Sequence, residues 1–128
     1  MQLTLRHNLP CVRLIVSYQG QEIEIPDVVV DTGSAATVIA ADTASQIGII
    51  PRPDDVLHVV RGVGGTEIVY TRKVDRLQVG SRAVRKFEVE VAGLDYGFDV
   101  CGILGTEFLS RMGAVIYLGA LAICFAAD

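Results

Sequence analysis

Apolar and polar residues alternate with a period of two along most of the chain, which is typical of β-strands with one buried face. Val28–Val30 is β-branched throughout, as expected of a strand buried on both faces. Tyr18–Gln21 and Gly80-Ser81 have the composition of hairpin turns. The strands predicted in this way are Leu3–Leu5, Val12–Val16, Glu22–Ile25, Val28–Val30, Val56–Val60, Glu67–Thr71, Val74–Val79, Ala83–Val91, Val100–Leu104, Val115–Leu118 and Leu121–Phe125.

Two short segments have the pattern of helices. Ala41–Ile47 ends at Gly48, a residue that commonly stops a helix. Glu107–Met112 has Thr106 as its predicted N-cap and Gly113 as its stop. The pattern therefore indicates a mostly β fold with two short helices.

Length and composition agree with one compact domain. The chain has 128 residues, of which 51% are hydrophobic and 20% are charged, and its mean hydropathy is +0.45. Disordered chains instead combine low hydrophobicity with high net charge. No linker or low-complexity segment interrupts the chain, so we expect a single domain over residues 1–128.

The charge balance argues against a nucleic-acid partner. The net charge is −4 and the pI about 5.1, so the chain has no overall basic field. Arginines do crowd its middle, but strand-rich sequences often carry such charges on a solvated face. These arginines are Arg61, Arg72, Arg76, Arg82 and Arg85.

Cys11, Cys101 and Cys124 are odd in number, lack C-x-x-C spacing and each follow apolar neighbours, so we expect three buried thiols in a reducing compartment. The N-terminal residues lack the apolar region of a signal peptide. The longest apolar run, Ala114–Ala127, is too short to span a bilayer as a helix. A cytoplasmic location without a membrane partner is therefore expected, although the chain could be a domain of a longer protein.

Asp31-Thr32-Gly33-Ser34 directly follows the buried strand Val28–Val30. A carboxylate in that position is costly unless it is hydrogen-bonded or used in chemistry. The same four residues are also common in turns, so alone they do not distinguish a catalytic acid from a turn. Phosphate-handling folds that use Asp-Thr-Gly need a partner such as a Walker lysine motif, which the chain lacks.

Three motifs occur in a specific order. Val29–Ala35 contains D-T-G-S, Arg61–Thr66 is a glycine-rich hairpin tip, and Gly102–Leu109 is G-I-L-G-T-E-F-L. With these motifs the chain resembles the retropepsin family of aspartic proteases, which includes retroviral proteases and single-domain bacterial relatives. The resemblance extends from about Cys11 to Phe125.

The resemblance implies a retropepsin-like closed β-barrel and the activity of an aspartic endopeptidase, with no metal or organic cofactor. It implies that Asp31 is catalytic, that Thr32 locks two active-site loops together, and that Gly33 lets the substrate backbone come close. Gly62–Gly65 would form a flap tip and Gly102–Gly105 a glycine loop beneath the site. The residues implied at the substrate are Ser34, Ala35, Gly62, Val63, Gly64, Gly65, Ile103 and Gly105.

The chain has one D-T-G motif, whereas the mechanism of this family needs two carboxylates. We therefore expect a homodimer, in which a twofold axis brings together Asp31 of each copy, and a peptide or protein substrate. The terminal segment Ala114–Phe125 is expected to be a hairpin with its turn at Gly119-Ala120. It could be ordinary core or could pair with its copy across the dimer.

Two positions depart from the retroviral pattern. Ser34 replaces the usual alanine, as in the pepsin-like form, and its hydroxyl could donate to the outer oxygen of Asp31. Thr106-Glu107 stands where retroviral relatives have a basic residue, so an Arg–Asp pair that bears on dimer stability is absent.

Other polar residues have weaker interpretations. His7 and His58 lack neighbours at metal-ligand spacing, so a zinc site is not expected. Asp27 is expected to be solvated or in a turn, and Tyr70 to line the substrate groove or to pack in the core. Asp99 would be the candidate for a second carboxylate within one chain if no dimer formed. An idle peptide-binding or dimerisation module, and a monomer with Asp31 as a lone acid, are the other functions that the sequence leaves open.

Overall fold

The computed structural model describes residues 1–62, 65–94 and 100–126. An eight-stranded sheet has the strand order β1-β2-β3-β8-β4-β7-β6-β5, and β9 and β10 form a separate two-stranded sheet. The strands are β1 (Thr4–Arg6), β2 (Leu9–Tyr18), β3 (Gln21–Val30), β4 (Val38–Ala40), β5 (His58–Gly62), β6 (Gly65–Val79), β7 (Arg82–Ala92), β8 (Gly102–Leu104), β9 (Val115–Tyr117) and β10 (Ala122–Cys124), and the helices are α1 (Ala41–Ser45) and α2 (Thr106–Arg111).

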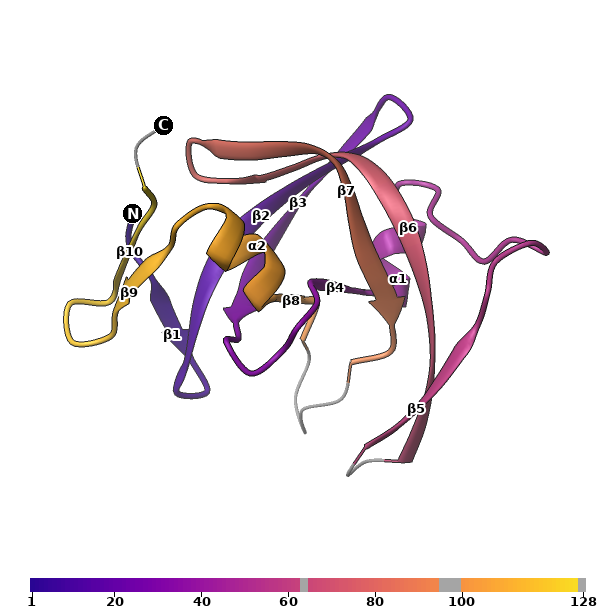
Figure 1. The fold of residues 1–128 in the computed structure, drawn as a ribbon, viewed down its shortest axis with the longest axis horizontal. Coiled ribbons are helices and arrows are strands. Elements are labelled where there is room, and N and C mark those ends of the chain that lie inside the picture. Colours follow the sequence, from indigo (N-terminus) through magenta and orange to yellow (C-terminus); the bar gives the residue numbers. More distant parts are fainter. Residues whose placement is uncertain (63–64, 95–99, 127–128) are drawn as a thin grey trace.

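A pairing between β2 and β6 turns the large sheet into a barrel-like ring. The ring runs from β2 through β3, β8, β4, β7 and β6 and returns to β2, while β1 and β5 extend it at either end (Figure 1). The inward-facing side chains of these strands meet Phe108 of α2 in one apolar cluster. Burial of this cluster is the main driving force that holds the ring together.

The alternation pattern located the strands, but two breaks in it are not strand ends. Strand β3 includes both of the predicted strands Glu22–Ile25 and Val28–Val30. The residues between them, Pro26 and Asp27, form a bulge opposite Arg13. Asp27 has φ of 57° there. Glu67–Thr71 and Val74–Val79 are likewise parts of β6. The pattern missed β4, because three residues are too few to show a period.

Both helices form close to where they were expected. Gly48 (φ 81°) and Gly113 (φ 61°) have the left-handed backbone conformation of helix stops, which confirms this part of the prediction. The predicted N-cap of α2 is wrong: Gly105 is the cap, and Thr106 is the first helical residue. Neither helix in the described part of the chain is long and apolar enough to cross a membrane.

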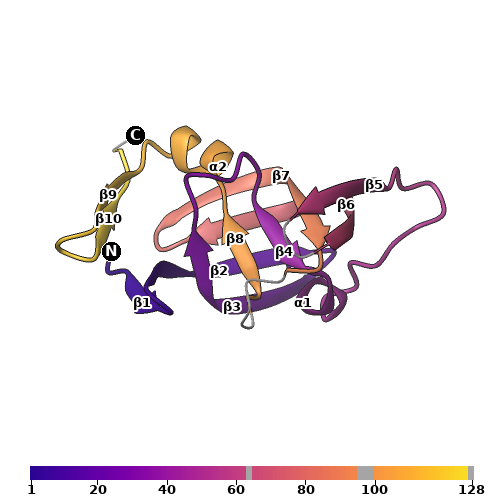
Figure 2. The same ribbon diagram turned by 90° about the horizontal axis from the view of Figure 1, so that it is seen from below.

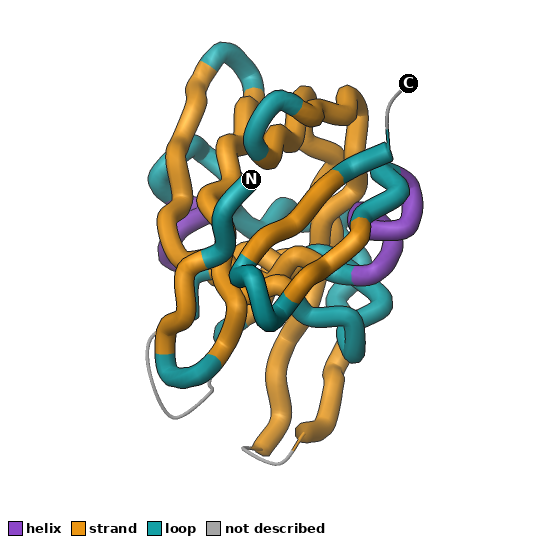
Figure 3. The backbone as a smooth tube through the Cα atoms, turned by 90° about the vertical axis from the view of Figure 1, so that its left-hand side faces the viewer, coloured by secondary structure: helices purple, strands orange, loops and turns teal. Residues whose placement is uncertain are grey.

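The two ends of the chain pack together at one side of the ring, as Figures 2 and 3 show. Leu3 N donates to the carbonyl oxygen of Leu121 at 2.7 Å, and Ile123 N donates to that of Met1 at 2.9 Å. The predicted terminal hairpin is therefore correct, with the side chain of Ile123 in the core.

The three cysteines are free thiols in different surroundings. Cys11 is buried as expected, and this burial, followed by the nearby Asp27 charge, raises the pKa of its thiol despite the opposing effect of Arg6. Cys101 and Cys124 are exposed, so the expectation that they are buried is wrong. Apolar neighbours did not predict burial at Cys124, because adjacent residues of a strand face opposite sides.

Arg72 is buried and does not lie on the solvated face expected for the arginines of this region. Its side chain is 6% exposed and forms an ion pair with Asp55, itself 13% exposed, at 2.6 Å. The same Nη2 donates to the carbonyl oxygen of Ile50 at 2.9 Å, and the guanidinium lies over the ring of Tyr70. Burial also raises the pKa of the Tyr70 phenol. The pair attaches the segment that leads into β5 to the middle of β6.

We expect Asp55→Ala to lower the free energy of unfolding by about 3 kcal/mol, because the buried Arg72 charge would lose its counter-charge. Asp54→Ala, at the exposed neighbouring acid, is the matched control and should change stability by less than about 0.5 kcal/mol. Urea unfolding at fixed protein concentration measures both values. Equal values for the two variants would show that the ion pair has no such role.

Candidate active site

Asp31 directly follows the last residue of β3, where this buried strand reaches the surface. Val30 pairs in parallel with Leu104 of β8, and the Asp31 amide donates to the Leu104 carbonyl oxygen at 3.0 Å. Asp31 is half-buried, while Thr32 and Gly33 are exposed. The carboxylate therefore lies at the boundary between the core and solvent, where a dissolved substrate can reach it.

The chain then turns back onto this carboxylate. The Gly33 amide donates to Asp31 Oδ1 at 2.9 Å, and the Ser34 amide donates to the Asp31 carbonyl oxygen at 3.2 Å. A Cβ atom at Gly33 would lie 3.1 Å from Oδ1, closer than ordinary van der Waals contact. The glycine thus allows a tight turn whose backbone orients the acid.

The Ser34 hydroxyl has a different partner from the one expected. It donates to the carbonyl oxygen of Ala36 at 2.8 Å. A hydroxyl has one proton to donate, so in this arrangement it does not also donate to Asp31. Ser34 stabilises the returning part of the loop, and a contact of Ser34 or Ala35 with substrate stays a prediction.

The turns after β3 and β8 lie side by side, because β8 is inserted between β3 and β4. The Thr106 amide donates to Ser34 O and its hydroxyl to Thr32 O, each at 2.8 Å. The Glu107 amide donates to Ala35 O at 3.3 Å. The first turn of α2 therefore binds the backbone of the D-T-G loop directly.

Gly105 makes this close approach possible. A Cβ atom at this position would lie 2.3 Å from the carbonyl oxygen of Ala36, a backbone atom that cannot rotate away. Gly105 is buried under the loop, and Ile103 is buried in a small cluster with Cys11 and Val29. Both residues support the loop from beneath in the single chain, which does not favour the expected contact with substrate.

Thr37 and Glu107 form a polar cluster that sequence reasoning missed. Thr37 is completely buried, and its amide donates to Glu107 Oε2 at 2.7 Å and its hydroxyl to Glu107 Oε1 at 2.6 Å. The hydroxyl in turn accepts the Gly105 amide at 3.1 Å. The sequence contains one signal for this cluster: an acid in the first turn of a helix, directly after a glycine turn. Acids are common in the first turn of helices, so this signal did not distinguish Glu107 from an ordinary helical residue.

The hairpin of β5 and β6 projects away from the ring (Figure 1). Its pairing runs from His58 opposite Val69 to Gly62 opposite Gly65, and the predicted tip residues Val63 and Gly64 lie outside the described residues. Val59 and Ile68 are directly paired and are 68% and 60% exposed. Exposed apolar side chains on a projecting hairpin are suited to contact with another molecule.

Comparison with known proteins agrees with this geometry. A family model described as "Aspartyl protease" matches residues 14–108, most of the chain. The chain belongs to the aspartyl protease family. No curated protein sequence gives a significant match.

Two solved structures show that this family member has the retropepsin-like fold. A retropepsin-like aspartic protease from Rickettsia conorii has a TM-score of 0.72 and 15% identity, with 97% of each chain covered. The EIAV protease, solved with the inhibitor HBY-793, has a TM-score of 0.61 and 19% identity, with 88% of this chain and 95% of that chain covered. The predicted fold class is therefore confirmed.

Two other candidate residues of this aspartyl protease have contacts of their own. Asp27 forms an ion pair with Arg6 at 2.6 Å, and Tyr70 packs in the core. Asp99, the candidate second acid, lies outside the described residues. Among the residues that are described, no three His, Cys, Asp or Glu side chains come together as a metal site would require.

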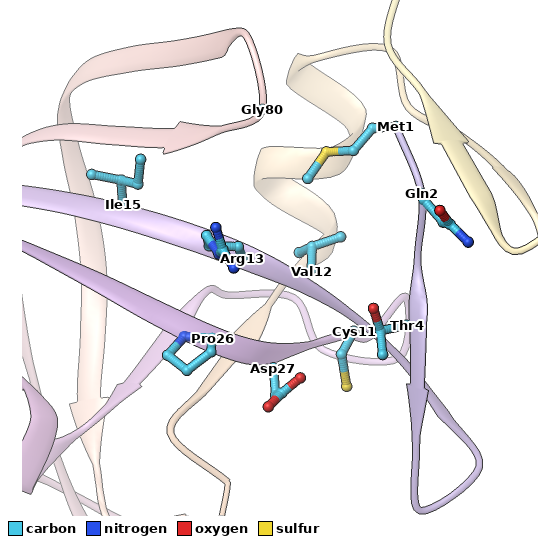
Figure 4. A pocket seen from close by; sticks show the side chains of 10 residues that line it. All are labelled: Met1, Gln2, Thr4, Cys11, Val12, Arg13, Ile15, Pro26, Asp27 and Gly80. Carbon is cyan, nitrogen blue, oxygen red and sulfur yellow. The ribbon is translucent and has the colours of Figure 1, made fainter.

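A hollow lies between the N-terminal segment and strands β2 and β3 (Figure 4). Its lining includes Arg13, Asp27 and Cys11, and Asp31 is not part of it. In this aspartyl protease chain the candidate acid Asp31 thus lies on an exposed loop and not in this hollow.

We expect Gly105→Ala to destabilise the protein by more than about 2 kcal/mol, because the new methyl group would collide with the Ala36 carbonyl oxygen. Gly119→Ala is the control, since a Cβ atom there meets nothing within 4 Å. Thermal unfolding of both variants tests this. If Gly105→Ala unfolds at the wild-type temperature, the two turns are not packed as described.

Proposed function

We propose that the protein is a homodimeric aspartic endopeptidase, in which Asp31 of two copies activates a water molecule against a peptide bond. The observation that carries this proposal is the placement of Asp31. Its carboxylate stands at the exposed end of a buried strand and is oriented by the Gly33 amide, within a chain of the aspartyl protease family.

The requirement for two copies is supported by the two parallel strands of the site. Val30 is opposite Leu104, so the residue after β8 that corresponds to Asp31 is Gly105, which has no side chain. Of these two corresponding positions only that of Asp31 has a carboxylate, and a twofold axis through the exposed loop would supply the second.

Two carboxylates within a few ångströms do not both ionise readily, so the pair shares one proton. The ionised acid accepts a proton from the attacking water, and the protonated acid donates its proton to the carbonyl oxygen of the scissile bond. The result is a tetrahedral diol and a pair that again holds one proton. Activity should therefore fall at both acidic and alkaline pH.

The substrate is proposed to bind as an extended peptide between the β5–β6 hairpin and the D-T-G loop. Main-chain hydrogen bonds would give affinity and apolar contacts selectivity. Val59 and Ile68 on the hairpin, and exposed Thr32 and Gly33 on the loop, support this arrangement. Thr32, whose carbonyl oxygen is held by Thr106, is proposed to join the loops of the two copies.

The dimer contact is proposed to include the terminal hairpin. Val115, Tyr117 and Leu118 expose large apolar side chains on β9 and in its turn. Such residues fit the core of an interface between copies. The free thiols are consistent with a reducing, cytoplasmic setting, which is part of the proposal.

We expect Asp31→Asn to reduce cleavage of an unfolded protein substrate by at least about 1,000-fold, because the amide can neither accept nor donate the transferred proton. Wild-type cleavage should be blocked by a statine-type inhibitor. Asp42→Asn, an exposed acid on α1, should cleave like the wild type. Equal digestion by Asp31→Asn and the wild type would exclude the catalytic role and favour an idle module.

We expect Leu118→Asp to weaken dimerisation at least tenfold, because it places a charge in an apolar contact. Gln21→Asp, at the exposed start of β3, adds the same charge elsewhere and is the control. Analytical ultracentrifugation gives the dissociation constants, and specific activity should fall on dilution in parallel. A wild-type protein that is fully active as a monomer would contradict the proposed assembly.

A further inference from the structure

Thr37 closes the D-T-G loop where the chain enters β4, and each of its polar backbone and side-chain groups has a hydrogen-bond partner. Its amide and hydroxyl donate to Glu107, and its hydroxyl oxygen also accepts the Gly105 amide. Its carbonyl oxygen accepts the Glu90 amide of β7 at 2.9 Å. This one side chain therefore joins the loop, the glycine turn and α2.

The partner of Thr37 acts as an acceptor through both carboxylate oxygens. Glu107 Oε2 accepts the Thr37 amide at 2.7 Å. Oε1 accepts the Thr37 hydroxyl at 2.6 Å and the Phe108 amide at 2.9 Å. An ionised carboxylate accepts at both oxygens, whereas a glutamine amide accepts at one and donates at the other. The donor set thus fits an ionised acid and does not fit its amide.

These contacts determine where the loop after Asp31 can lie. Pairing of β3 with β8 holds the start of the loop at Asp31, whose amide binds Leu104 O. The end of the loop is held at Thr37 by Glu107. Between these two points the carbonyl oxygens of Thr32, Ser34 and Ala35 accept hydrogen bonds from the first turn of α2, which contains Glu107. The direction of the Asp31 carboxylate therefore depends on both ends.

We infer that Glu107 is a positioning residue of the protease: its carboxylate, acting through Thr37, holds the D-T-G loop in the geometry that catalysis needs. This inference rests on the proposed function, since Glu107 would act on the reaction through Asp31. Misplacement of a reacting group by about 1 Å can cost about 100-fold in rate. A loss of the Glu107 contacts should therefore appear mainly in kcat.

The test compares four variants of the full chain. Glu107→Gln removes one acceptor, Thr37→Val removes the hydroxyl at constant size, and Thr37→Ser keeps the hydroxyl. Glu88→Gln makes the same chemical change at an exposed glutamate of β7. Reactions are run well below the unfolding temperature, and the concentration of active sites is titrated with a tight statine-type inhibitor.

We expect Glu107→Gln and Thr37→Val to lower kcat per titrated site by about tenfold or more while KM changes less than about twofold. Thr37→Ser and Glu88→Gln should stay within about twofold of the wild type. A purely structural role would reduce the number of active sites and leave kcat per site unchanged. That result would overturn the inference.

Amide hydrogen exchange without substrate separates this inference from the proposed function. Peptides that cover residues 31–37 should exchange at least about fivefold faster in Glu107→Gln than in Glu88→Gln or the wild type. If Glu107→Gln exchanges faster but the wild-type protein does not cleave peptides, the protease proposal is refuted and the positioning of the loop by Glu107 is still supported. Unchanged exchange would overturn the positioning role. If Glu107→Gln does not fold, Thr37→Val provides the same comparison.

Discussion

The candidate active site depends on the contact between two turns, one after β3 and one after β8. These strands end side by side, so the two turns must fit within hydrogen-bonding distance of each other. The turn after β3 contains Asp31, and the turn after β8 contains Gly105 under the Ala36 carbonyl group. A side chain at Gly105 would separate the turns and break the bonds from Thr106 and Glu107 to the loop. Because Gly105 has no side chain, the turn after β8 can bind the backbone of the loop that contains Asp31.

The remaining structure divides into parts that bury apolar surface and parts that leave it exposed. The ring of strands and α2 enclose the core, and the buried Arg72–Asp55 pair attaches the segment before β5 to it. Large apolar side chains stay exposed on the β5–β6 hairpin and at the terminal hairpin. Solvent exposure of such side chains is unfavourable unless another molecule covers them. These exposed surfaces are consistent with the proposed assembly of the chain with a substrate and a second copy.

Sequence reasoning performed well for features with a local signature and poorly for those that depend on distant partners. Alternation located most strands, and glycine stops located the helix ends at Gly48 and Gly113. Thr37 and Glu107 are 70 positions apart, and neither residue type indicates that the other will be its partner. The Ser34 hydroxyl was expected to reach Asp31, but the turn directs it to Ala36. Arg72 was expected in solvent but is buried. Its burial depends on an ion pair with Asp55 from another segment, which the sequence around Arg72 does not reveal.

The order of the three motifs by itself determined the family and marked Asp31 as the candidate acid, and the period of two determined a mostly β chain. These features are local, because they depend on residue type, on backbone freedom and on which face of a strand is apolar. The tertiary structure alone decided that β8 inserts between β3 and β4, that Glu107 reaches Thr37, and which thiols are buried. Such contacts join distant residues, and their energies depend on a geometry that exists only after the ring has closed.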